Sequence, residues 1–120
     1  MAKRILVIDD DEDILNIFNI VFGEAGYEVI ISQTGTDTAH IKLLHPDLIL
    51  LDVRITGSPK SGPEICKEIK KEFELITIPV LLVSAEPDIV KLAGACGANG
   101  YLPKPFDIDK LLAKVEEFVT

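Results

Sequence analysis

The sequence predicts an α/β fold: a doubly wound parallel sheet of five strands, built from five successive strand–helix units. Short apolar runs alternate along the chain with longer stretches in which apolar side chains recur at helical spacing. The runs lack the polar alternation of a half-exposed strand, which is typical of strands covered on both faces of a parallel sheet. A chain of 120 residues is long enough for one core, so residues 1–120 are expected to form a single domain.

Composition excludes several classes of protein. A hydrophobic content of 48% excludes a disordered chain, and a net charge of −8 argues against binding nucleic acid by neutralising its phosphates. No apolar stretch approaches the length of a membrane span, and the amino terminus lacks the pattern of a secretory signal, so we expect a cytoplasmic protein without a membrane partner. Cys66 and Cys96 lack metal-ligand spacing and are expected to be small apolar side chains of the core rather than ligands or a disulfide.

The first half of the chain contains two predicted strand–helix units. Residues 4–9 form a strand, and residues 14–25 form a helix that Gly26 ends, since glycine accepts a left-handed cap. A second strand at 29–31 precedes a helix at 36–44. The predicted buried face of the first helix consists of Ile14, Phe18, Val21, Phe22 and Ala25.

The third and fourth units follow a loop rich in glycine and proline. The third strand is predicted at 48–52, the loop at 53–62, and a helix at 63–73 with proline at its first position, where no backbone donor is needed. A fourth strand at 79–83 precedes a short helix that ends near residue 96 and is interrupted by glycine.

The last unit consists of a strand near 99–102 and a helix capped by Asp107. The predicted buried face of this helix consists of Ile108, Leu111, Leu112, Val115 and Phe118.

Polar residues lie at the ends of four of the predicted strands or just beyond them. Asp9 ends the first strand and Asp10 follows it, Asp52 ends the third, Ser84 follows the fourth, and Lys104 lies two residues beyond the fifth. Parallel strands share a carboxyl edge, where open α/β sheets place their sites, so these side chains are expected to meet. Three carboxylates repel one another unless a cation neutralises them, and one Mg²⁺ together with the lysine would bring the formal charge to zero.

A simpler interpretation is that each acid caps the helix that follows it. Asp10, Asp11 and Asp13 all precede Ile14 closely enough to do so. This interpretation leaves Asp52 unexplained, because a loop rather than a helix follows it, and it does not account for a hydroxyl and an ammonium at the same edge. The pattern as a whole therefore favours a site.

Four segments in this order resemble the receiver domains of two-component response regulators: 5–10 (ILVIDD), 47–52 (DLILLD), 84–85 (SA) and 100–106 (GYLPKPF). The resemblance covers essentially the whole chain. It implies a flavodoxin-like sheet with strand order 2-1-3-4-5. It also implies a phosphorylation-dependent signalling module rather than an enzyme acting on an external substrate.

The resemblance implies roles for the residues at the carboxyl edge. Asp52 is the implied phosphoacceptor, which takes a phosphoryl group from a histidine kinase or a histidine phosphotransfer protein. Asp9 and Asp10, with Asp52 and the backbone carbonyl of Arg54, are the implied Mg²⁺ ligands. Lys104 is expected to offset charge on the transferred group.

Further roles concern switching and partners. By the same resemblance Ser84 bonds the phosphoryl group, Tyr101 is the switch aromatic, and the Lys104–Pro105 peptide is cis. The fourth helix, fifth strand and fifth helix then form the face that controls an output domain or a downstream protein. Ile17 and Ile20, on the first helix, are the expected contacts with the kinase.

The chain departs from the family after the phosphoacceptor. Thr56 stands where a proline is usual, and the loop is about two residues longer than the common pattern, which loops tolerate at small cost. Arg54 occupies the place of the second aspartate of aspartyl phosphatases, which argues against that class. An Arg54–Glu86 pair either shields the acyl phosphate from water or is a solvated surface pair, and the sequence leaves both open. A degenerate receiver that binds proteins without phosphorylation is the alternative function.

Overall fold

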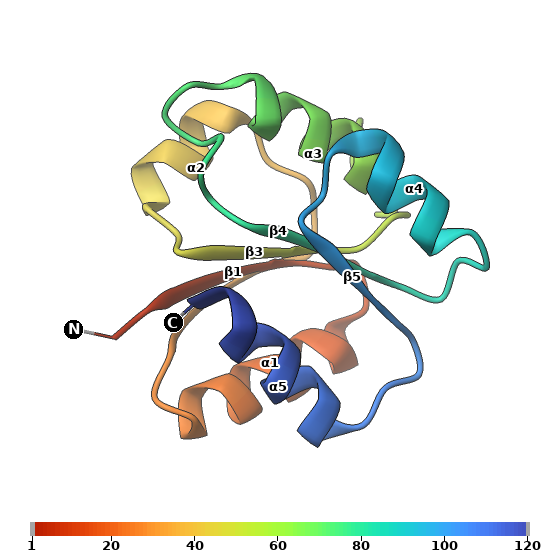
Figure 1. Ribbon diagram of the computed structural model, residues 1–120. Helices are drawn as coiled ribbons and strands as arrows, with labels where there is room; N and C mark the ends of the chain where they lie inside the picture. The colour runs from red at the N-terminus through yellow and green to blue at the C-terminus, as the bar shows by residue number, and fades with distance from the viewer. Residues whose placement is uncertain (1, 120) are drawn as a thin grey trace.

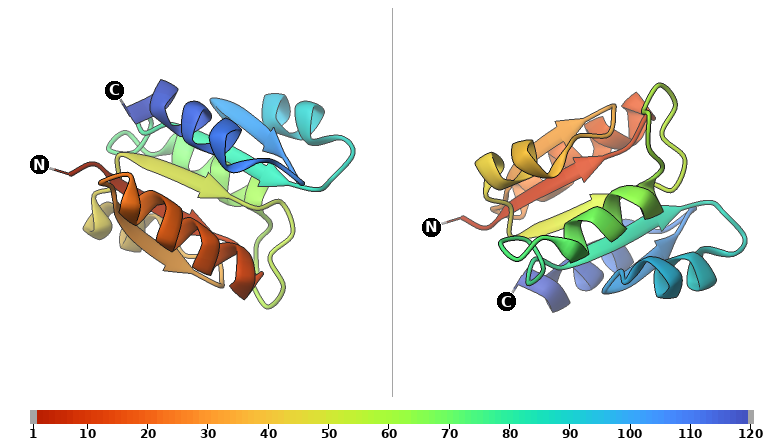
Figure 2. Two further views of the ribbon diagram at one scale, coloured as in Figure 1. Left: turned by 90° about the horizontal axis from the view of Figure 1, so that it is seen from below. Right: turned by 90° about the horizontal axis from the view of Figure 1, so that it is seen from above.

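The computed structural model describes residues 2–119, which form one parallel sheet with strand order β2-β1-β3-β4-β5 (Figure 2). The strands are β1 (Arg4–Ile8), β2 (Glu28–Ser32), β3 (Leu48–Leu51), β4 (Val80–Ser84) and β5 (Gly100–Pro103). The helices are α1 (Glu12–Glu24), α2 (Thr38–Leu44), α3 (Gly62–Lys71), α4 (Ile89–Cys96) and α5 (Ile108–Val119). The predicted fold class and strand order are confirmed.

Helices cover both faces of the sheet. Figure 1 shows α1 and α5 against one face and α2, α3 and α4 against the other. Alternate residues of each inner strand serve the two cores: in β1, Leu6 and Ile8 face the three-helix side, and Ile5 and Val7 face the two-helix side. This arrangement explains why the central strands are apolar at every position. Among residues 2–119, no helix is both long and apolar enough to cross a membrane.

The cap of α1 lies at Asp11, one of the three candidates. Its carboxylate accepts hydrogen bonds from the backbone N–H groups of Asp13 at 2.9 Å and Ile14 at 3.3 Å, and the helix begins at Glu12, two residues before the predicted start. Because Asp11 caps the helix, the carboxylates of Asp9 and Asp10 remain available for a site at the carboxyl edge of the sheet. In α2 the cap is Asp37, so this helix also begins two residues from its predicted start.

The predicted buried faces need four corrections. Leu15 is buried and was not predicted, whereas Ala25 is exposed, because α1 ends at Glu24 before the turn at Gly26 (φ 93°). Helix α3 also ends at Lys71, two residues before its predicted end, and Phe73 beyond it is 92% exposed. Ile108 is 41% exposed in the first turn of α5. In α5, Val119 joins Leu111 and Val115 in the core.

Strand register aligns the ends of the inner strands. Ile8 pairs with Leu51, and the backbone N–H of Asp52 donates to the Ile8 carbonyl at 3.0 Å. Ser84 pairs with Pro103, and the N–H of Lys104 donates to the Ser84 carbonyl at 2.9 Å. The residues just beyond these pairs therefore lie side by side at the carboxyl edge.

Candidate functional site

Lys104 joins two carboxylates at this edge. Its ammonium lies 2.8 Å from Oδ2 of Asp9 and 3.4 Å from Oδ2 of Asp52. Asp9 is 2% exposed and Asp52 is 9% exposed, so both are withdrawn from bulk water. The structure thus brings together, from β1, β3 and β5, residues that lie up to 95 positions apart in the sequence.

Backbone N–H groups hydrogen-bond one oxygen of each of the three aspartate carboxylates. Oδ1 of Asp9 accepts a hydrogen bond from the Asp11 N–H at 2.9 Å, and Oδ1 of Asp52 accepts one from the Val53 N–H at 2.7 Å. Asp10 is half-buried, and its Oδ2 accepts from the backbone N–H of Thr56 at 3.0 Å. All three carboxylates therefore have one oxygen that is held by the backbone.

Burial and ion pairing shift the pKa values of Asp9 and Lys104 in opposite directions. Burial raises the pKa of Asp9 above its usual value, and the bond from Lys104 only partly offsets that effect. Burial also pulls the pKa of Lys104 down, but the bond to Asp9 and the charges of Asp52 and Asp9 outweigh it, so the pKa of Lys104 is raised. The pKa of Asp10 is lowered by hydrogen bonds from the hydroxyl and the backbone N–H of Thr56.

The donor set fits a hard divalent cation. One carboxylate oxygen from each of Asp9, Asp10 and Asp52 can be chosen so that the three lie within 4.8 Å of one another. Three carboxylates against the single ammonium of Lys104 leave a formal charge of −2, which a divalent ion balances. Carboxylate oxygens are the ligands that Mg²⁺ prefers. The carbonyl of Arg54 as a further ligand stays a prediction.

The predicted switch residues flank the cluster. Ser84 is 3% exposed at the end of β4, and its Oγ accepts a hydrogen bond from the Glu86 N–H at 3.3 Å. Tyr101 is 37% exposed in β5, and its place in the strand is beside Leu82. The Lys104–Pro105 peptide is cis, as the resemblance implies.

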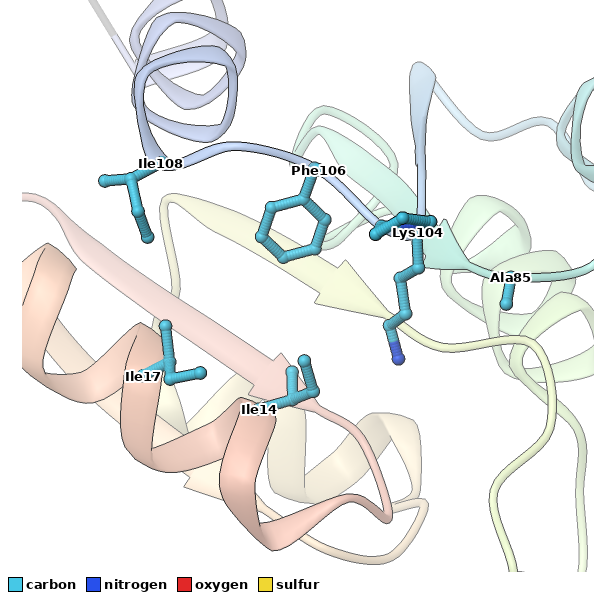
Figure 3. Close-up of a pocket in the computed structure, with 7 residues that line it drawn as sticks. Ile14, Ile17, Ala85, Lys104, Phe106 and Ile108 are labelled. Carbon is cyan, nitrogen blue, oxygen red and sulfur yellow. The ribbon is translucent and has the colours of Figure 1, made fainter.

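An apolar groove of about 420 Å³ adjoins Lys104. In Figure 3, Ile14 and Ile17 of α1 lie across it from Phe106 and Ile108. Ile17 is 42% exposed at this groove, and Ile20 is 61% exposed and does not line it. The structure therefore places both predicted partner contacts on the surface, but only Ile17 beside the site.

Two residues of the β3–α3 loop, and the first residue of α3, make contacts that matter to the site. Arg54 pairs through its Nε with the carboxylate of Glu86, a contact that both hypotheses for this pair include, and its side chain is 83% exposed. Thr56 bonds Asp10, and Gly62 approaches the backbone of Asp52, as described below. The sequence marked Thr56 and the loop's length as unusual, but it did not indicate what Thr56 or Gly62 contacts.

Comparison with known proteins places this geometry in context. A family model described as the response regulator receiver domain matches residues 5–116. A putative response regulator from Chloroflexus aurantiacus is 30% identical with a TM-score of 0.89, covering 99% of this chain and 98% of that one. The chemotaxis protein CheY4 of Vibrio cholerae is 25% identical with a TM-score of 0.84, covering 98% and 99%. NtrX from Brucella abortus is 29% identical with a TM-score of 0.86, and the match covers 99% of this chain but 27% of NtrX.

Proposed function

This chain belongs to the response regulator receiver domain family, and from that premise we propose that Asp52 accepts a phosphoryl group from a histidine kinase or a histidine phosphotransfer protein. The observation that carries the proposal is the cluster in which Asp52 lies beside Asp9, Asp10 and the ammonium of Lys104. In the proposed reaction an oxygen of Asp52 attacks phosphorus, a P–O bond forms, and the P–N bond of the donor's phosphohistidine breaks. The imidazole leaves with the electron pair.

The surrounding residues supply the charge that this transfer needs. Asp9 and Asp10, with Asp52 and the Arg54 carbonyl, would hold Mg²⁺, which supplies neutralisation of the phosphoryl oxygens when it is bound. Lys104 is already within reach of Asp52 and offsets further charge as the acyl phosphate forms. The Ser84 hydroxyl lies at the adjacent strand end, from which it would turn to donate to a phosphoryl oxygen.

Signal output would pass through the face formed by α4, β5 and α5. The partial exposure of Tyr101 supports a resting form in which this side chain has room to move inward once Ser84 engages the phosphoryl group. In NtrX the matching region is 27% of a longer chain, so either a further domain or a separate downstream protein would read this face. We expect no turnover of an external substrate, only self-catalysed phosphoryl transfer and hydrolysis, in a cytoplasmic setting.

The direct test is intact mass after incubation with acetyl phosphate, with and without Mg²⁺. We expect one phosphoryl adduct on the native chain in Mg²⁺, little in EDTA, and none on Asp52→Asn. Asp109→Asn, which removes an exposed carboxylate of α5, is the matched control and should label like the native chain. Absence of an adduct, under conditions that label another receiver, would overturn the proposal in favour of a phosphorylation-independent binding module.

A second prediction concerns the kinase surface. Ile20→Glu places a charge on the exposed face of α1 and should slow phosphotransfer from a cognate kinase about tenfold or more, because it disrupts a desolvated apolar contact. Labelling by acetyl phosphate should be unchanged. Leu43→Glu makes the same change at an exposed position of α2 and should affect neither donor. Equal losses with both donors would contradict a docking role for Ile20.

A further inference from the structure

Asp10 depends on a residue 46 positions away for its orientation. The backbone N–H of Thr56 donates to Oδ2 of Asp10 at 3.0 Å, and the Thr56 hydroxyl interacts with the same carboxylate and lowers its pKa. One residue thus offers two donors to one carboxylate. Both belong to the loop that follows the phosphoacceptor strand.

The other two carboxylates of the cluster are held differently. Asp9 and Asp52 each bond the Lys104 ammonium, and each also bonds a backbone N–H within two residues of itself. Asp10 is the most exposed of the three. Among the described residues, Asp10 takes its long-range hydrogen bonds from Thr56 and none from Lys104.

The loop residues on both sides of Thr56 are held by contacts with the rest of the fold. Ile55 is 6% exposed and belongs to the core on the three-helix side. Gly57 turns the chain with φ 83°, and the Ser58 N–H donates back to the Ile55 carbonyl at 3.1 Å. Ser58 lies so close to Gly35 that a Cβ on this glycine would come within 2.3 Å of the Ser58 Oγ. Thr56 is therefore fixed from both sides, and its β-branched side chain has few rotamers.

From this geometry we propose that Thr56 is a positioning residue that holds Asp10 ready to bind a divalent cation. With Oδ2 engaged by Thr56, Oδ1 is left to the cation, and the side chain need not lose rotamer freedom when the ion binds. Hydrogen bonds from Thr56 also withdraw some negative charge from the Asp10 carboxylate, which lowers its affinity for a cation. The gain in affinity from orientation outweighs this loss, because a neutral donor leaves the carboxylate its full formal charge. The inference rests on the proposed Mg²⁺-dependent function and adds a residue to it.

The test is the dissociation constant for Mg²⁺ alone, measured by isothermal titration calorimetry on the full chain at neutral pH. Thr56→Val keeps the shape and the backbone N–H but removes the hydroxyl, and should weaken binding about fivefold. Thr56→Pro removes both donors and should weaken it further, to roughly twentyfold. Thr56→Ser keeps both donors and should stay within about twofold of the native value. Thr34→Val, the same change in an exposed loop after β2, is the control and should have no effect.

Unfolding in urea separates positioning from a structural role. Thr56→Val should unfold like the native chain in EDTA and gain less stability from Mg²⁺, since only metal binding is affected. Native Mg²⁺ affinity in Thr56→Val would overturn the inference, as would a loss of stability in EDTA with no loss of affinity.

Phosphorylation then distinguishes this inference from the proposed function. At saturating Mg²⁺, Thr56→Val should recover the native extent of labelling by acetyl phosphate. A native chain that labels on Asp52 while Thr56→Val binds Mg²⁺ normally refutes the role of Thr56 alone. A native chain that neither binds Mg²⁺ nor labels refutes the proposed function.

Discussion

Lys104→Met is expected to slow phosphorylation by acetyl phosphate on the order of 10²-fold at saturating Mg²⁺, the usual cost of losing one preorganised electrostatic contact to a developing anion. The same variant should also be less stable than the native chain in EDTA, by about 1–3 kcal/mol. The reason is that Lys104 is the cation bonded to both Asp9 and Asp52, and methionine fills similar space without the charge. Two carboxylates withdrawn from water would then repel each other without compensation.

The stability loss should depend on pH in a defined direction. Burial already raises the pKa of Asp9, and removing the Lys104 bond, which lowers it, raises it further. A carboxyl whose folded-state pKa lies above its unfolded value favours the folded state when it is protonated. The loss of folding stability caused by the raised pKa of Asp9 is therefore fully present at pH values above the folded-state pKa. It is absent at pH values below the unfolded-state pKa. The deficit of Lys104→Met should be largest at neutral pH and narrow as the pH falls toward about 4.

Urea unfolding at several pH values in EDTA, together with the rate of mass adduct formation, measures both effects. Lys110→Met removes an exposed ammonium of α5 and serves as the control, with a change in unfolding free energy within about 0.5 kcal/mol. A Lys104→Met variant of native stability at every pH would show that solvent, rather than the lysine, compensates the carboxylates.

The sequence predicted the fold and the carboxyl-edge cluster because both follow from local patterns. Fully apolar runs indicate buried parallel strands, and parallel strands place their following residues at one edge. Asp9, Asp52 and Lys104 were therefore predictable as neighbours without any knowledge of side-chain positions. Burial within helices was less predictable, because it depends on the residue at which each helix begins and ends. Leu15 is buried and Ala25 is exposed, the reverse of the prediction, because α1 begins at Glu12 and ends before residue 25.

The contacts of Thr56, in the β3–α3 loop, could not be predicted from the sequence for a physical reason. A loop has no periodicity, so nothing in its sequence states which distant atoms it reaches. Thr56 was visible only as an unexpected residue, whereas its bonds to Asp10 depend on the path of the chain between Ile55 and Gly57. Gly62 was likewise predicted as one glycine of a loop. In the structure it is the first residue of α3 and one of the closest backbone approaches to the phosphoacceptor strand.

Gly62→Ala should be among the most destabilising substitutions outside the core, at roughly 3 kcal/mol. An added Cβ would lie 1.8 Å from the carbonyl oxygen of Asp52 and 3.1 Å from the Cα of Val53. Both are backbone atoms of the segment that carries the phosphoacceptor, so neither can move aside as a flexible side chain would. The N–H of Gly62 also donates to the Val53 carbonyl at 2.8 Å, which ties the start of α3 to this segment. Relief of the clash must therefore displace α3 or Asp52 itself.

Two measurements distinguish these ways of relieving the clash. If α3 moves, Gly62→Ala loses stability in urea but labels at the native rate wherever it remains folded; if Asp52 moves, the labelling rate falls as well. Gly94→Ala is the matched control, because a Cβ at this position of α4 meets no atom within 4 Å. That change should stabilise the chain by about 0.5–1 kcal/mol, since alanine favours a helix interior over glycine. A Gly62→Ala variant as stable as the native chain would show that the close approach to Asp52 is not needed for the fold.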